Sequence, residues 1–186
     1  MHFPIFLLGI VSASIANSYL IDPNLEDGVY FIPLLTNSTK FRIAETTYGE
    51  PILIDDAVVT HAVPKRSVIG VVPVPTTAKL CYTKTENATE LDGARDSLSK
   101  ICDSGTKIRR YYSKPGILLA RQGCSIAWAC SLGGKQGCAP NEIEDAWSQI
   151  ADNCGSSLVG GQIYASSWKK SYGHSAFTTY VCSNEV

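Results

Sequence analysis

The placement of the cysteines is the feature that most constrains how this chain can fold. All seven cysteines lie after residue 80, and residues 1–80 contain none. Disulfides persist in oxidising compartments, and small secreted domains depend on them. The pattern therefore predicts a secreted chain whose C-terminal part carries a disulfide framework.

An odd number of cysteines leaves one thiol outside the intramolecular bridges. We expect three disulfides among six residues whose pairing the sequence leaves open, namely Cys81, Cys102, Cys124, Cys130, Cys154 and Cys182. Cys138 is the expected remaining thiol, because it lies in the loop SLGGKQGCAP, where no periodic element fixes its direction. It would be free, or it would join two copies into a disulfide-linked homodimer.

Residues 1–16 are typical of an export signal. A short apolar core is followed by small residues, and Ser14 and Ala16 suit the last positions before a signal peptidase cut. The apolar run is shorter than the about 20 residues that a transmembrane helix needs. Sequons at Asn37 and Asn87 fit passage through a secretory route, so we expect an extracellular glycoprotein.

A dibasic pair, Lys65-Arg66, separates the cysteine-free segment from the cysteine-rich one. Pro64 keeps the residue before it extended, which suits exposure to a processing protease of the kexin type. We therefore expect a prosegment at 17–66 and a mature domain at 67–186. The alternative is a solvated pair in a loop. Arg109-Arg110 is a second candidate site, although KIRRYY there also fits the edge of a strand.

The expected prosegment has its own β pattern. Residues 29–35, 41–45 and 51–59 each predict a strand, so the prosegment would form a small β unit that packs on the mature domain. Residues 67–75 contain two prolines and predict an edge strand or an extended arm.

Two helices are expected in the mature domain. The first covers 89–105, with Thr89 as its cap and Gly105 at its end. The second covers 140–155, with Asn141 as its cap and Gly155 in the left-handed position after its last turn. An apolar stripe marks the buried face of the second helix: Ile143, Ala146, Trp147, Ile150, Ala151 and Cys154.

Strands surround these helices and define the expected fold class. They cover 79–85, 107–113, 116–130, 162–170 and 175–182, and residues 171–174 form the turn between the last two. The order is β-α-β-β-α-β-β. It predicts an α+β two-layer sandwich, with an antiparallel sheet, two helices on one face, and disulfides that staple the layers.

Chemical motifs are sparse. No nucleophile elbow, phosphate loop, dinucleotide fingerprint or zinc spacing occurs, so we expect no catalytic residue, metal or cofactor. The net charge of −1 gives no argument for a nucleic-acid partner. His174 is the one histidine after residue 66 and is expected to be a solvated turn residue. The alternative is a secreted ribonuclease in which His174 acts with Arg121 and Glu144.

A contact surface is expected near the tip of the last hairpin. Trp168, Lys169 and Lys170, with Tyr172 just after, place an aromatic ring and two charges together. Such a group suits an anionic surface. The alternative is an exposed hairpin whose lysines serve solubility.

These features resemble the secreted killer toxins and small cysteine-rich effectors of fungi. The resemblance rests on the export signal, on Pro64-Lys65-Arg66, and on the topology of residues 79–182, above all residues 153–155 and TTYVC at 178–182. It implies an α/β sandwich made as a preproprotein and cut by a kexin-type protease. It also implies a non-enzymatic role, in which the protein binds a surface molecule, channel or host molecule of a target cell.

Three functional classes therefore stay open. The first is a secreted toxin-like or effector protein that acts by binding. The second is a small secreted hydrolase such as a ribonuclease. The third is a secreted cell-wall protein without activity, which the lack of Ser/Thr-rich stalks and repeats disfavours.

Overall fold

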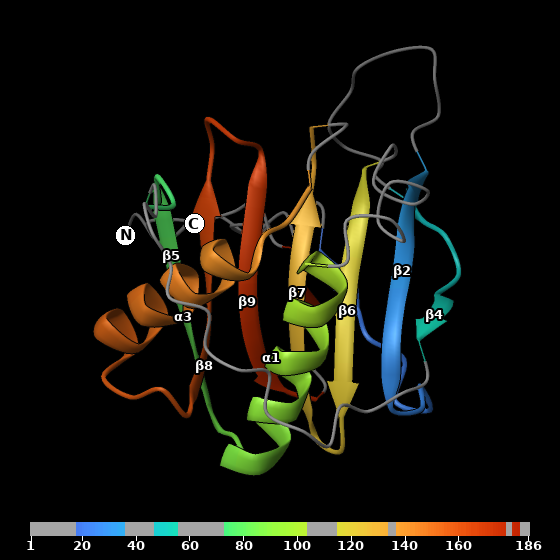
Figure 1. The fold of residues 1–186 in the computed structure, drawn as a ribbon, viewed down its shortest axis with the longest axis horizontal. Helices are drawn as coiled ribbons and strands as arrows, with labels where there is room; N and C mark the ends of the chain where they lie inside the picture. Colours follow the sequence, from blue (N-terminus) through green and yellow to red (C-terminus); the bar gives the residue numbers. More distant parts are fainter. Residues whose placement is uncertain are drawn as a thin grey trace, which may run out of the picture.

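The fold is one antiparallel sheet with two helices packed on the same face (Figure 1). This computed structural model describes residues 18–35, 47–55, 73–103, 115–133, 137–177 and 180–182. Within them, the sheet has eight strands, and all of its pairings are antiparallel. The predicted α+β fold class is confirmed.

The strand order in the sheet is β3-β2-β6-β7-β9-β8-β5, and β4 also pairs with β2. The elements are β1 (Tyr19–Leu20), β2 (Gly28–Leu35), β3 (Thr47–Tyr48), β4 (Ile52–Asp55), β5 (Ala78–Thr85), α1 (Ala88–Asp103), β6 (Gly116–Gln122), β7 (Ser125–Ser131), α3 (Pro140–Cys154), β8 (Val159–Ala165), β9 (Lys170–Ala176) and β10 (Tyr180–Val181). From β5 to β9 the order is the predicted β-α-β-β-α-β-β.

The central hairpin differs from the prediction. Residues 116–130 were expected to form one strand, but β6 and β7 pair with each other around a turn at Gly123 and Cys124. Gly123 has a φ of +56°, a left-handed conformation that glycine adopts without a steric penalty. The expected strand at 107–113 and the dibasic pair Arg109-Arg110 lie outside the described residues.

The last hairpin was also predicted in the wrong place. Residues 171–174 are the middle of β9, and the chain turns instead at 166–169. Gly173 is needed there for close packing, because a Cβ on it would lie 2.3 Å from the Trp128 ring. The glycine that suggested a turn therefore makes room for a neighbouring indole.

Both predicted helices are present, but their N-terminal caps differ. For α1 the side chain of Asn87 accepts hydrogen bonds from the backbone N–H of Thr89 and Glu90, so Asn87 and not Thr89 is the cap. Helix α3 begins one residue before Asn141, with Pro140 in its first turn and no side-chain cap. Its predicted end is confirmed, since Gly155 has a φ of +79°.

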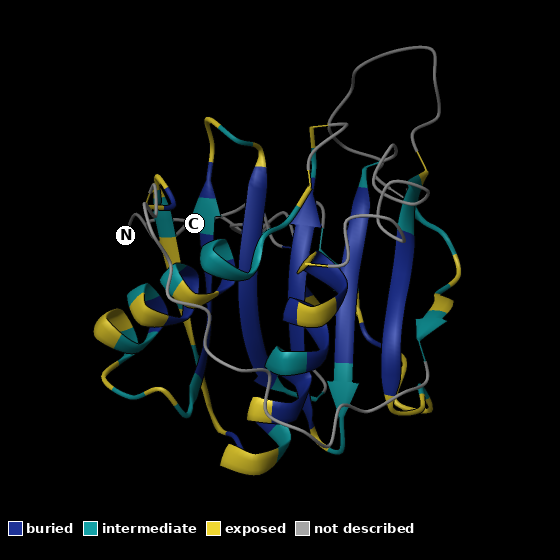
Figure 2. Ribbon diagram, viewed as in Figure 1, coloured by how far each residue is buried: buried dark blue, intermediate teal, exposed yellow. Residues whose placement is uncertain are grey.

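Alternation along the strands gives the sheet two buried faces, and the central strands are buried along most of their length (Figure 2). The helix-side face carries Leu118 and Ala120, which pack with α1 and α3. The opposite face carries Ile117 and Leu119, which pack with residues of the short β1–β10 ribbon. The ribbon thus covers part of the face that the helices leave open.

The expected prosegment is part of this same sheet. Six residues of β2 pair with β6, so strand β2 of the expected prosegment continues the sheet that the later residues form. Residues 73–77 form no strand. Val74 is buried, its backbone N–H donates a hydrogen bond to the Asp145 carboxylate, and its carbonyl oxygen accepts one from the Gln149 amide, as an arm lying on α3 would. The export signal, the strand at 41–45, Asn37 and Lys65-Arg66 lie outside the described residues.

Candidate functional site

Three disulfides fasten elements that are distant in the sequence. Cys81–Cys154 joins β5 to α3, Cys102–Cys138 joins α1 to the segment before α3, and Cys130–Cys182 joins β7 to the end of the ribbon. The expected number of bridges is confirmed. The expected remaining thiol is not: Cys138 is paired, and Cys124 is the free cysteine.

Cys124 lies exposed in the turn between β6 and β7. Its backbone N–H donates to Glu90 at 2.7 Å, and its carbonyl oxygen accepts from the N–H of Phe177 at 2.6 Å. These bonds hold the turn in place, so the thiol projects from a fixed backbone. Gly123 is the residue from which the sequence could have shown that Cys124 lies in a turn.

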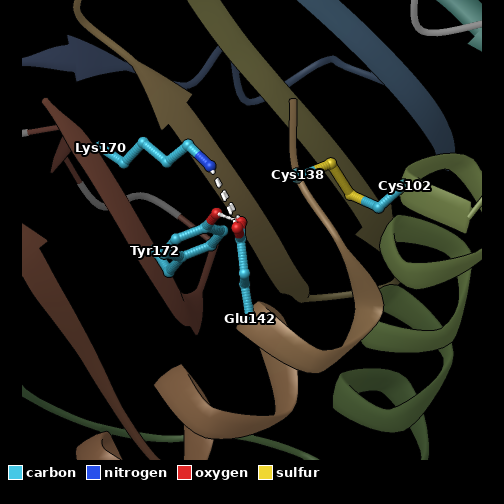
Figure 3. Close-up of a disulfide and its surroundings, with 5 residues drawn as sticks. All are labelled: Cys102, Cys138, Glu142, Lys170 and Tyr172. Carbon is cyan, nitrogen blue, oxygen red and sulfur yellow. Dashed lines mark hydrogen bonds and ion pairs between the residues drawn. A yellow bond between two sulfur atoms is a disulfide. The ribbon is translucent and has the colours of Figure 1, made fainter. Parts of the chain in front are cut away.

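A carboxylate at the start of α3 accepts hydrogen bonds from a lysine and a tyrosine of β9 (Figure 3). Glu142 lies 3.0 Å from the Lys170 ammonium, and the Tyr172 hydroxyl donates to the same carboxylate oxygen. Lys170 also lies 5.3 Å from the centre of the Trp168 ring. The Cys102–Cys138 bridge lies beside this group and fixes the chain that leads into α3.

This cluster corrects the predicted contact surface. Lys170 is 8% exposed and Tyr172 is 1% exposed, and both are committed to Glu142. Trp168 is half-buried against the helix-side core, and only Lys169 is exposed. Lys170 and Tyr172 are therefore not available for contact with an anionic surface.

A second polar group lies wholly inside the molecule. His174 Nδ1 is 2.5 Å from a carboxylate oxygen of Glu86, and both side chains are fully buried. The indole of Trp147 stacks on the imidazole, with ring centres 5.0 Å apart. The expectation of a solvated turn histidine is wrong, because His174 belongs to a central strand and faces the helices.

The alternative ribonuclease set is not assembled here. His174 is bound to Glu86, whereas Arg121 lies over the Phe177 ring at 4.1 Å. Glu144 lies 4.0 Å from Arg95 on α1. Each member of the set thus has its own partner on a different element.

Several large apolar side chains are exposed on different strands. In the part of the chain that the structure describes, the large apolar side chains with high exposure are Leu20, Leu35, Ile52, Leu53 and Tyr180. Leu20 and Tyr180 are direct partners across the ribbon and are about half exposed. The Tyr82 hydroxyl donates to the Tyr180 carbonyl at 3.1 Å, and burial raises the pKa of Tyr82, so this donor stays protonated.

The sequon at Asn87 is exposed, and its side chain also caps α1. The cap uses the amide oxygen, whereas an N-linked glycan is carried by the amide nitrogen. The two roles are therefore compatible at this residue.

The described residues contain no cluster of three or more histidine, cysteine, aspartate or glutamate side chains that could hold a metal. Neither helix has the length and apolar character needed to cross a membrane.

Comparison with known proteins gives no relative. No family model, no curated protein and no solved structure matches this chain.

Proposed function

We propose that this chain is a secreted, disulfide-stabilised binding protein, toxin-like or effector-like, which is processed by cleavage after Lys65-Arg66. It recognises a surface molecule of a target or host cell and catalyses no reaction. The observation that carries the proposal is the set of three disulfides, which join α3 and the C-terminal ribbon to the sheet and α1 to the segment before α3. Such a framework suits an extracellular environment. The apolar signal at residues 1–16 supports the same location.

The burial of His174 supports binding over hydrolysis. A general acid or base must come within hydrogen-bond reach of the substrate, either directly or through one water. A fully buried imidazole that is already bound to Glu86 does not meet that requirement. This favours the binding class over the ribonuclease alternative.

The ribbon supplies the contact surface in this proposal. Leu20 and Tyr180 present two adjacent apolar side chains to solvent. The Cys130–Cys182 bridge and the bond from Tyr82 fix the ribbon over the sheet. A surface ordered in advance loses little conformational entropy on binding, which favours affinity.

The test uses a dye attached to the free thiol of Cys124, which lies in a turn between other strands. Labelled protein is titrated onto yeast cells and onto plant protoplasts. We expect saturable binding to one of them and at least a tenfold loss in the double variant Leu20→Ser, Tyr180→Ser. The matched control is Ile52→Ser, Leu53→Ser on β4, which should bind like the parent.

A nuclease assay on the same samples tests the alternative. We expect no cleavage of yeast RNA above buffer. RNA cleavage that disappears in both Arg121→Ala and Glu144→Ala would overturn the binding proposal in favour of a hydrolase. These two variants keep the buried pair of Glu86 and His174, whereas His174→Ala would leave Glu86 buried without its partner and would lower stability.

A further inference from the structure

The N-terminal strands complete both faces of the sheet. Val29 on β2 packs in the helix-side core, while Tyr30 and Ile32 pack in the core on the opposite face. Ile21, beside the ribbon, joins the second core. These four side chains are at most 6% exposed, so Ile21 and residues 28–32 lie in the interior of the fold.

Backbone pairing attaches the same residues at two places. Strand β2 pairs with β6 from Gly28, opposite Arg121, to Pro33, opposite Gly116. Strand β1 pairs with β10, where Tyr19 lies opposite Val181. Without β2, the outer edge of β6 would expose a row of unpaired backbone groups.

Polar contacts fasten the turn that leads into β2. The carboxylate of Asp27 accepts from the Gly123 N–H at 2.8 Å and lies 3.8 Å from Arg121. The Arg121 guanidinium also donates to the carbonyl oxygen of Pro23 at 3.4 Å. The segment is therefore held by hydrogen bonds as well as by its buried side chains.

No covalent cross-link connects this segment to the rest of the chain. All cysteines lie at or after Cys81, so the three disulfides connect only later residues to one another. If the backbone is cut after Arg66, non-covalent contacts such as those described above hold the N-terminal segment in place.

We propose that cleavage after Arg66 does not release the N-terminal segment, and that the processed protein is a two-chain complex held together without a covalent bond. This inference rests on the processing step of the proposed function. Residues 67–186 are then one subunit, and the expected prosegment is the other. The first chain also brings Leu20, half of the contact surface, to the second chain, which brings Tyr180.

The test treats the purified, oxidised protein with a kexin-type protease and follows it by native size exclusion and mass spectrometry. We expect both fragments at the elution volume of the uncut protein, in equal molar amounts. Urea without reductant should separate them into two masses, with all three disulfides intact. The variant Lys65→Gln, Arg66→Gln should stay a single mass in urea.

A matched pair of variants tests the contacts themselves. Ile32 is fully buried on β2, whereas Leu35 on the same strand is 49% exposed. After cleavage, Ile32→Ala should raise the rate at which the N-terminal fragment leaves at least tenfold, and Leu35→Ala should leave that rate close to the parent's. Equal rates for the two variants would contradict the proposed contacts.

Two results would overturn the proposal in different ways. A folded 67–186 fragment that elutes alone after cleavage would contradict only the two-chain inference and leave processing intact. An uncut mass would show that Lys65-Arg66 is not a processing site, which removes the inference together with that step of the proposed function. Binding to cells is measured separately, so a failure of recognition is distinguishable from both.

Discussion

At the scale of single residues, the buried pair of Glu86 and His174 is the most consequential feature. Glu86 lies between β5 and α1, and His174 lies in the middle of β9, so the pair connects this short link to the sheet through side chains. Buried polar groups are costly unless they are paired, which makes each partner necessary to the other. The stacked ring of Trp147 closes this group from the helix side.

Glu86→Gln tests this pair. The change keeps the shape of the side chain but replaces its carboxyl group with an amide, which alters the buried contact with His174. We expect it to lower the free energy of unfolding by about 1–3 kcal/mol. The measurement is urea unfolding with disulfides intact. Glu144→Gln is the matched control: that side chain is 54% exposed and its ion pair is long, so the change should stay within about 0.5 kcal/mol. Equal unfolding midpoints for the two variants would refute the role of the pair.

Prediction from the sequence failed at two glycines, because a glycine can mark either a turn or a place of close packing inside a strand. The stretch from Ser171 to His174 has a composition typical of a turn, yet Gly173 serves close packing against Trp128 inside β9. At Gly123 the error ran the other way, because a true turn was included in a strand. Both outcomes depend on neighbours that are distant in the sequence, so local pattern alone could not decide between them.

At the scale of elements, α3 is the helix that the sequence predicted best. Its apolar positions recur at helical spacing, and Ile143, Ala146, Trp147 and Ile150 are all buried in the structure. The pattern succeeded because one face of the helix covers the sheet while the other faces solvent. Its cap was not predictable in the same way, since Pro140 and Asn141 are both suitable residues for a helix start.

Trp147→Ala tests whether α3 anchors the core. Trp147 is 7% exposed between the helix and β9, and we expect its truncation to cost about 3–5 kcal/mol in denaturant unfolding. Trp168→Ala is the control, because that ring is only partly buried, and it should cost less than half as much. A loss below about 1 kcal/mol for Trp147→Ala would mean that the indole is not packed as described.

At the scale of the whole molecule, the number of bridges followed from counting cysteines, but their pairing did not. Each bridge joins residues that are far apart in the sequence, with separations of 73, 36 and 52. Cys138 was expected to stay unpaired because its loop has no periodic pattern, yet α1 approaches that loop in the fold. The partner of a cysteine is thus decided by how the helices pack.

Alkylation without reductant tests the disulfide framework. The folded monomer should take up one label, and peptide mapping should place it on Cys124, the exposed free thiol. A label on Cys138, or three or more labels on folded protein, would contradict the three bridges. A dimer that takes up no label would instead show that Cys124 joins two copies.

The pairing of β1 with β10 has a consequence for how the protein is made. Tyr19, near the start of the chain, pairs with Val181, near its end. A chain is synthesised from its N-terminus, so β1 emerges long before its partner β10. Folds dominated by such distant pairings form slowly. We therefore expect the β1–β10 ribbon, and the cover that it gives to one face of the sheet, to form only after Val181 has been synthesised.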